Sequence, residues 1–236
     1  MELEEKYAKI CIVVPVRNRP DMVTRLLDCF NNSEAKEIEQ IYVDDAGDEE
    51  TKKILIDHIA QHSHASYLRN DRQQLFTRAL NRGIRAAQPD NDYYCCVNSD
   101  CILKPGWLAR LVEAHFKHAG AAIIGYADGR PGPGDGEQQA YYPSRPNHPD
   151  YITGHCFMVP KWAWESVGVL CETDPNQAHI SSERLWCWRA AMEGNHMFYV
   201  NSDLCIHDEG GASWGRSLEW LYSFPYHTLW PGRDEL

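Results

Sequence analysis

The sequence predicts an α/β fold in which helices cover a mostly parallel central sheet. Short β-branched runs, such as residues 10–14 and 38–43, alternate with segments of helical periodicity, such as residues 22–30 and 75–87. This alternation is typical of parallel sheets joined by right-handed crossovers. Polar residues directly follow several of the predicted strands, and ligands of such sheets bind at the carboxyl ends of the strands. We therefore expect a functional site at that edge.

The first half of the chain repeats one pattern of strand, polar turn and helix. The β-branched run 10–14 ends at a proline and is followed by apolar residues at helical spacing over 22–30. Residues 38–43 and 54–59 repeat the pattern around the acidic turn 44–50. The next predicted elements are a short strand at 67–68, a helix at 75–87, a strand at 93–97 and a helix at 107–118.

The second half contains a long stretch without such periodicity. A strand is predicted at 121–126, and residues 127–150 are dominated by Gly, Pro, Asp and Asn. A structureless segment of this length is usually functional, so we expect a mobile loop beside the site, with a passive insertion as the alternative. The further predicted elements are a strand at 152–159, helices beginning near 161 and spanning 182–193, and a strand at 197–200.

Length and composition describe an ordinary globular chain. Its 236 residues suffice for one domain with a substantial core, and 43% of them are hydrophobic. The formal net charge of -11 disfavours nucleic acid and anionic membranes as partners. No apolar run is long enough for a transmembrane helix, and the charged residues 1–9 precede no signal-peptide apolar region. We therefore expect a cytoplasmic protein.

Nine cysteines are scattered through the predicted strands and helices. They are Cys11, Cys29, Cys95, Cys96, Cys101, Cys156, Cys171, Cys187 and Cys205. Because they form no CxxC pair and no zinc-ribbon spacing, we expect buried, reduced thiols.

Polar residues follow the predicted strands at 15–18, 44–47 and 98–100. The carboxyl ends of parallel strands share one edge of a sheet, so we expect these segments to converge in space. In the last of them, Asn98 and Asp100 lie two residues apart and can share one face of an extended chain. That arrangement suits a divalent cation that also carries water and a diphosphate, although such triplets also start ordinary turns.

Three other features are candidates for chemistry. His207 follows the last predicted strand and has an imidazole that can complete a metal shell, with a structural role as the alternative. The adjacent carboxylates of Asp44 and Asp45 are costly to hold together without a donor or a cation, so they either face a ligand or form a hydrogen-bonded turn. Glu183 opens a helix, where a carboxylate caps the helix or acts as a general base.

A basic cluster lies between Arg69 and Arg85. Its members are Arg69, Arg72, Arg78, Arg82 and Arg85. Such a cluster either holds a diphosphate or forms a solvated helix face.

Several short segments stand at the predicted strand ends and helix starts. In the first half they are IVVPVRNRP at 12–20, DDAGDEET at 44–51, LNRGIRAA at 80–87, VNSD at 97–100 and PGWL at 105–108. In the second half they are TGHCFMV at 153–159, SERLWCWR at 182–189, and His207 followed by Gly210, Gly211 and Ser213.

In this order the segments resemble the motifs of the inverting glycosyltransferases of family 2, which have the GT-A fold. The first five are similar to the PxxNRP loop, the DDxSxDxT turn, the NxGixxA helix, an NxD variant of the DxD motif and the PGWL helix. The later three are similar to the GxxxxxR strand, the EDxDLCxR helix and the HxxGxS motif. The resemblance implies a single GT-A domain over 1–236, with a Rossmann-like sheet and a smaller acceptor-side subregion. Its nucleotide-binding half would span about 1–125 and its acceptor and catalytic half about 150–236, joined by the Gly- and Pro-rich loop 127–150.

The resemblance also implies roles for particular residues. The nucleotide of a UDP, GDP or dTDP sugar donor would be bound by Pro15, Arg17, Asp44, Asp45, Arg78, Asn98 and Ser99. Gly154 and His155 would line the donor sugar and the acceptor. Asp100 and His207 would hold Mn2+ or Mg2+ on the diphosphate. Glu183 would deprotonate the acceptor hydroxyl, on a glycan or glycoconjugate, in a single inverting displacement.

This chain departs from the family motifs at several positions that bear on the chemistry. Asn98 replaces the first acid of DxD, which leaves metal binding mainly to Asp100. Ser182 replaces the Glu of ED, and Leu185 replaces a following acid. Glu183 is the acid that remains in this motif. It stands where the family has Asp, and its side chain is longer by one methylene group.

Three other functions are alternatives to an inverting glycosyltransferase. A catalytically inactive relative would bind a nucleotide sugar or a carbohydrate without turnover. A sugar nucleotidyltransferase would have a glycine-rich basic loop after the first strand, and residues 15–20 lack it. A dinucleotide-dependent dehydrogenase would have GxGxxG after a strand, which is absent.

Overall fold

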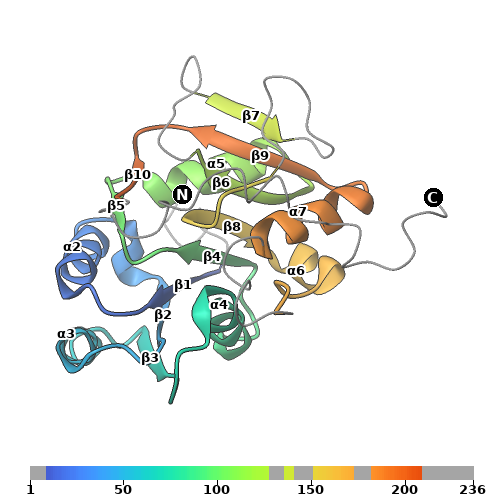
Figure 1. Ribbon diagram of the computed structural model, residues 1–236. Coiled ribbons are helices and arrows are strands. Elements are labelled where there is room, and N and C mark those ends of the chain that lie inside the picture. Colours follow the sequence, from blue (N-terminus) through green and yellow to red (C-terminus); the bar gives the residue numbers. More distant parts are fainter. Residues whose placement is uncertain (1–8, 128–135, 141–150, 173–181, 209–236) are drawn as a thin grey trace.

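The computed structural model describes residues 9–127, 136–140, 151–172 and 182–208 (Figure 1). Within these ranges an eight-stranded sheet has the order β3-β2-β1-β4-β8-β6-β9-β7. Its strands are β1 (Ile10–Val16), β2 (Glu39–Asp44), β3 (Ala65–Arg69), β4 (Tyr93–Val97), β6 (Ala121–Tyr126), β7 (Gly136–Ala140), β8 (Cys156–Pro160) and β9 (His196–Asn201).

Most neighbouring strands of this sheet run parallel. β1 pairs in parallel with β2 and β4, β2 with β3, and β6 with β9. β8 lies antiparallel between β4 and β6, and β7 is antiparallel to β9 at one edge. The predicted α/β class with a mostly parallel sheet is therefore confirmed, with two antiparallel strands whose direction the periodicity did not indicate.

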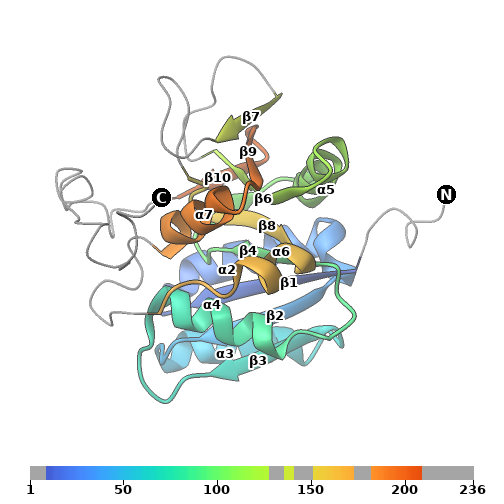
Figure 2. The ribbon, with the colours of Figure 1, turned by 90° about the vertical axis from the view of Figure 1, so that its right-hand side faces the viewer.

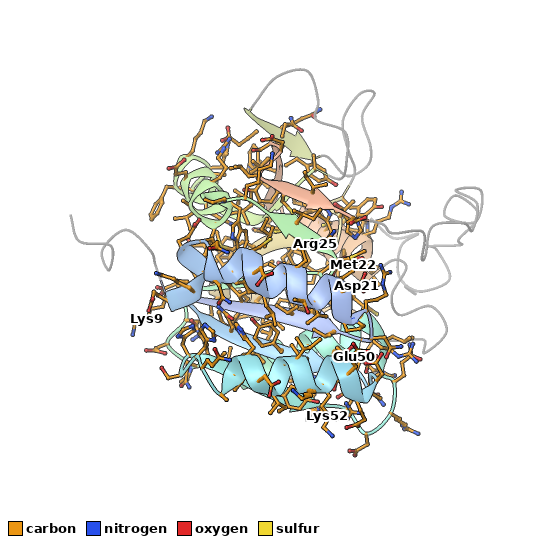
Figure 3. The ribbon with its side chains drawn as sticks, turned by 90° about the vertical axis from the view of Figure 1, so that its left-hand side faces the viewer. Lys9, Asp21, Met22, Arg25, Glu50 and Lys52 are labelled. Carbon is orange, nitrogen blue, oxygen red and sulfur yellow. The ribbon has the colours of Figure 1, made fainter. Side chains whose placement is uncertain are left out.

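Helices cover both faces of the sheet. On one face lie α2 (Pro20–Asn31), α3 (Glu49–Ile59) and α5 (Trp107–Lys117), the first two of which face the viewer in Figure 3. On the other face lie α4 (Leu75–Ala86), α6 (Lys161–Val167) and α7 (Ser182–Met192), seen from their side in Figure 2. β1 contributes side chains to the core under each of the two helix layers, because successive side chains of a strand point to opposite faces of the sheet. Ile12 packs in the core with α2, and Val13 in the core with α4.

Two local features explain how helices α3 and α4 are placed. The side chain of Asp48 accepts a hydrogen bond from the Thr51 N–H at 2.8 Å, so it caps α3, which begins at Glu49, inside the acidic turn predicted for residues 44–50. Gly83 lets α4 approach the sheet closely. A Cβ added there would lie 2.2 Å from Val13 Cγ1 and 3.0 Å from Val43 Cγ2.

A second, two-stranded sheet lies beside the main one. β5 (Cys101–Leu103) and β10 (Cys205–His207) pair antiparallel, with His207 opposite Cys101. These strands of three residues are too short for a periodic pattern, and the sequence did not predict them. The short helix η1 (Glu34–Glu37), before β2, was also not predicted.

The stretch 127–150 differs from the predicted loop in its middle. Gly136–Ala140 form β7, so that part of the expected loop was wrong. The Glu137 side chain is only 4% exposed, forms ion pairs with Arg110 (2.6 Å) and Lys117, and thereby fastens β7 to α5. The pattern of small polar residues did not indicate a strand because the strand is held by these ion pairs and by pairing with β9. Residues 128–135 and 141–150 lie outside the described ranges.

Two global predictions concern the thiols and the membrane. All nine cysteines fall in the described ranges, and none of them is in a disulfide there. Seven are buried, as expected, and Cys29 and Cys171 are partly exposed. Among the helices of the described ranges, none combines the length and the apolar character needed to cross a bilayer.

Candidate active site

The carboxyl ends of β1, β2 and β4 lie side by side, because β1 pairs in parallel with both neighbours. The Asp45 N–H donates to the Val16 carbonyl oxygen at 2.8 Å, and the Asn98 N–H donates to the His155 carbonyl oxygen at 2.7 Å. The predicted convergence of the three polar segments is therefore confirmed, and the segment before β8 joins them. The strand order turns back between β1 and β4, which is where open α/β sheets bind ligands.

Asp100 and His207 meet at this edge. The distance from Asp100 Oδ1 to His207 Nε2 is 3.3 Å, since the pairing of β5 with β10 places His207 opposite the residue that follows Asp100. The ring of His207 stacks on that of His155, with centroids 5.0 Å apart. Asp100 Oδ1 is buried, and His207 Nε2 at 3.3 Å does not meet it in good hydrogen-bond geometry. A buried carboxylate oxygen that is so weakly satisfied is costly, and a cation would satisfy it.

The donor set at this pair fits a divalent cation with few protein ligands. No group of three or more His, Cys, Asp or Glu side chains in the described part of the chain is arranged to hold a metal ion. One carboxylate and one imidazole suit Mn2+ or Mg2+ when a diphosphate and water complete the shell. Asp100 and His207 thus fit the predicted metal as a two-residue anchor.

Glu183 lies on the other side of the same edge, in the first turn of α7. Its carboxyl rests against Gly154, where an added Cβ would be 1.9 Å from Oε1. The Ser182 hydroxyl donates to Oε2 at 3.0 Å. Burial raises the pKa of the Glu183 carboxyl, against the opposing effects of hydrogen bonds, including that from Ser182, and of nearby His155. A carboxylate with a raised pKa is a stronger base than an ordinary one.

Gly154 and His155 connect the two sides. They precede β8, which begins at Cys156 and not at 152 as the sequence predicted. His155 Nδ1 lies 2.9 Å from Thr153 Oγ1, which fixes one edge of the ring. Asp100, His207, His155, Gly154 and Glu183 therefore form one continuous group, called here the site cluster.

The Asp44 carboxylate is fully buried and engaged by protein donors. It accepts hydrogen bonds from the Gly47 N–H at 2.7 Å and the Tyr67 hydroxyl at 2.5 Å, and it forms an ion pair with Arg69. These contacts hold the turn after β2. A carboxylate has about four acceptor sites, so about one is left for a ligand.

Asp45 shapes the loop before α4. It accepts from the Asn70 side-chain amide and the Gln74 N–H, both at 2.7 Å, and from the Leu75 N–H at 2.8 Å. Leu75 has a φ of 70°, a conformation that is strained for a residue with a side chain. Asp45 therefore stabilises an unfavourable backbone at the site edge.

The arginines of the basic cluster are largely engaged by protein groups. Arg78 donates to the Glu172 carbonyl oxygen at 3.3 Å, and Arg85 forms an ion pair with the Glu172 carboxylate at 3.2 Å. Arg82 donates to the Arg69 carbonyl oxygen at 2.7 Å, and Arg69 pairs with Asp44. Within the described ranges the cluster thus joins α4 to its surroundings more than it forms a continuous basic surface.

The other predicted nucleotide contacts line the same edge. Pro15 is half-buried near the end of β1, and Arg17 after it is exposed. Asn98 and Ser99 are half-buried after β4. The partners of His207 in the predicted HxxGxS motif, Gly210, Gly211 and Ser213, lie outside the described residues.

Sequence reasoning missed three residues that support the site cluster. The Asp208 N–H donates to the Asp100 carbonyl oxygen at 3.0 Å, and Arg25 on α2 pairs with the Asp208 carboxylate at 2.8 Å. Thr153 holds His155. Their signal was adjacency in sequence for Asp208 and Thr153, whereas Arg25 lies on a distant helix and had none.

Comparison with solved structures defines the class of fold. The mannosyltransferase PcManGT from Pyrobaculum calidifontis, in complex with GDP-Man and Mn2+, has a TM-score of 0.63 at 14% identity, over 84% of this chain and 56% of that one. S. aureus TarS 1-349 has a TM-score of 0.64 at 14% identity, over 84% and 60%. GalNAc-T7 with UDP, GalNAc and Mn2+ has a TM-score of 0.66 at 14% identity, over 86% and 44%. The chain thus has the GT-A fold and spans between 44% and 60% of these structures.

Comparison at the family level agrees with the fold. The profile of glycosyl transferase family 2 matches residues 11–162, which is more than half of the chain. The protein belongs to glycosyl transferase family 2. The matched region includes Asp100, Gly154 and His155, and ends before Glu183 and His207. A search of curated proteins gives no match.

Proposed function

We propose that the protein is an inverting glycosyltransferase that moves a sugar from a nucleotide-diphosphate-sugar to a hydroxyl group of a glycan or glycoconjugate. The site cluster carries this proposal, because Gly154 and His155 connect the Asp100–His207 pair to the half-buried Glu183: His155 stacks on His207, and Gly154 lies against the Glu183 carboxyl. Family membership and the GT-A fold support it. Solved structures of the same fold contain GDP-Man or UDP together with Mn2+.

Asp100 and His207 are the residues that would hold Mn2+ or Mg2+ in this reaction. When bound, such a cation neutralises the charge that grows on a leaving diphosphate. Thr153 fixes the ring of His155, and the stacked His155 and His207 rings orient each other. The buried Nε2 of His155 is a further polar atom at the donor's sugar or phosphate.

Glu183 takes the proton of the acceptor hydroxyl as that hydroxyl attacks the anomeric carbon. The Ser182 hydroxyl holds Oε2, so Oε1 is the oxygen available for the proton. A positioned base of this kind typically contributes about 10²- to 10⁴-fold in rate. Attack from the face opposite the diphosphate, in one step, inverts the anomeric configuration.

The nucleotide binds at the carboxyl ends of β1, β2 and β4. Asp44 and Asp45 act mainly by holding the loops there, because protein donors already occupy most of their acceptor sites. Arg17 is exposed at the end of β1 and is a side chain that can reach a nucleotide. Arg78 can contact the diphosphate if its long hydrogen bond to the Glu172 carbonyl oxygen, 3.3 Å, breaks.

A donor screen tests the proposal. UDP-, GDP- and dTDP-sugars are each added with Mn2+, and binding is read as a rise in Tm, since a ligand of the native state stabilises it by mass action. The donor that binds is then assayed for hydrolysis and transfer by the wild type and Glu183→Gln. We expect turnover in the wild type and at least a hundredfold loss in the variant.

Two results would contradict the assignment. Binding of a donor with equal turnover, or none, in both proteins would indicate a non-catalytic binding relative or a different base. Release of pyrophosphate from a nucleoside triphosphate and a sugar phosphate would indicate a nucleotidyltransferase.

A further inference from the structure

Gly154 and Glu183 fit together as a pair. The three heavy atoms nearest to a Cβ at position 154 all belong to Glu183: Oε1 at 1.9 Å, Cδ at 2.8 Å and Cγ at 3.1 Å. The end of the glutamate side chain therefore occupies the volume that any other residue at 154 would fill. The Ser182 hydroxyl holds the opposite oxygen, so the carboxyl is fixed between the two positions.

We propose that Gly154 is a positioning residue for Glu183, and that the missing side chain at 154 and the longer acid at 183 depend on each other. This inference rests on the proposed role of Glu183 as base. An aspartate at 183 would be shorter by one C–C bond, about 1.5 Å, and would withdraw its carboxyl from Gly154. An alanine at 154 would fill the space that this withdrawal opens.

The geometry separates this role from a role in folding. Gly154 is not among the glycines with positive φ, so its backbone accepts alanine. The atoms that an added Cβ would meet belong to the end of a side chain, not to backbone, so they can move. The substitution Gly154→Ala is thus expected to displace the carboxyl of Glu183 and leave the sheet intact. Gly125, by contrast, is surrounded by Ile152, Phe157 and a backbone carbonyl, where no such yielding is possible.

Four proteins test the pairing by activity: wild type, Gly154→Ala, Glu183→Asp and the double variant. We expect Gly154→Ala to lower kcat by at least a hundredfold with a donor KM within about threefold of wild type, because a displaced base acts in the chemical step. The double variant is expected to recover at least tenfold over Gly154→Ala. The matched control is Gly136→Ala, since a Cβ there meets nothing within 4 Å and the activity should be unchanged.

Stability provides a second readout that needs no turnover. Gly154→Ala is expected to lower Tm in the wild-type background and to leave it unchanged in the Glu183→Ala background, since the colliding side chain is then gone. A Tm loss of equal size in both backgrounds overturns the pairing, as does wild-type kcat in Gly154→Ala or losses that multiply in the double variant. Should the wild type transfer no sugar, the proposed function fails, while the Tm comparison still decides whether the pairing exists.

Discussion

The backbone N–H of Asp208 donates to the carbonyl oxygen of Asp100 at 3.0 Å, next to the side-chain contact between Asp100 and His207. The candidate metal pair is thus joined through both backbone and side chains. Arg25, labelled on α2 in Figure 3, forms an ion pair with the Asp208 carboxylate at 2.8 Å and ties this strand end to the helix layer.

Asp100→Asn keeps the shape of the side chain and removes its charge. We expect the Mn2+ concentration that half-saturates donor binding to rise at least tenfold, because the charged ligand of a two-residue anchor is lost. The measurement is the donor-induced Tm shift as a function of Mn2+. Asp57→Asn is the control: this carboxylate is exposed on α3 and pairs with Lys53, so the change should stay within threefold. Equal effects of the two variants would contradict the metal assignment.

Glu183→Gln is expected to lower kcat and raise stability together. Because burial raises the folded-state pKa of Glu183 above its ordinary 4.5, the folded state disfavours the ionised form. The resulting destabilisation is absent below pH 4.5, grows as the pH rises toward the folded-state pKa, and is complete above it. In Tm measurements from pH 4 to 8, the Tm of the glutamine variant should therefore exceed that of the wild type by an amount that grows toward neutral pH. Glu165→Gln, at an exposed position, should show no such trend.

For Glu137→Gln we expect the opposite effect on stability: the substitution should destabilise the protein at neutral pH. Burial alone would raise the pKa of Glu137, but the hydrogen bonds from Lys117 and Arg110 outweigh it and hold the pKa at about 2. The stabilisation is therefore present above pH 4.5 and is lost as the pH falls toward about 2.

At pH 7 we expect Glu137→Gln to cost about 1–3 kcal/mol of unfolding free energy in urea titrations, with a smaller cost at pH 3. Glu113→Gln, exposed on the same helix α5 that bears Arg110 and Lys117, should be nearly neutral at both pH values. A cost for Glu137→Gln that does not shrink at pH 3 would show that the ion pairs do not stabilise β7.

Gly83→Ala tests the packing of α4 on the sheet. Alanine is the better helix former by about 1 kcal/mol, yet its Cβ would lie 2.2 Å from Val13 Cγ1, and overpacking typically costs about 1–3 kcal/mol. We expect net destabilisation in chemical unfolding. Adding Val13→Ala should recover part of the loss, so a purely additive double variant would rule out the close contact.

The sequence predicted the main sheet well where strands carry long apolar runs. The predicted bounds of β4 and β6 agree with the structure, because those strands are buried almost throughout, with polar residues on both sides of β4 and a glycine before β6. The same criterion missed β7, whose residues are mostly polar, and the short pair β5 and β10. These strands depend on contacts with distant residues, which no local pattern encodes.

The candidate site was predicted as a set of residues but not as a set of contacts. The convergence of residues after β1, β2 and β4 followed from strand direction alone. The engagement of Asp45 by the loop before α4, and that of Arg78 by Glu172, did not follow, since these partners are 25 or more residues away in sequence. The same holds for the fit of Gly154 to Glu183.

The order β6-β9-β7 has a consequence for how the chain acquires its shape during synthesis. β7 precedes β9 in sequence, yet β9 lies between β6 and β7, and in the described ranges β7 pairs only with β9. On the ribosome, residues 136–140 therefore have no partner strand until residues 196–201 have left the exit tunnel. The β3-β2-β1-β4 half, built from consecutive crossovers, can form much earlier, so that half can fold while the edge that β9 and β7 will complete is still open.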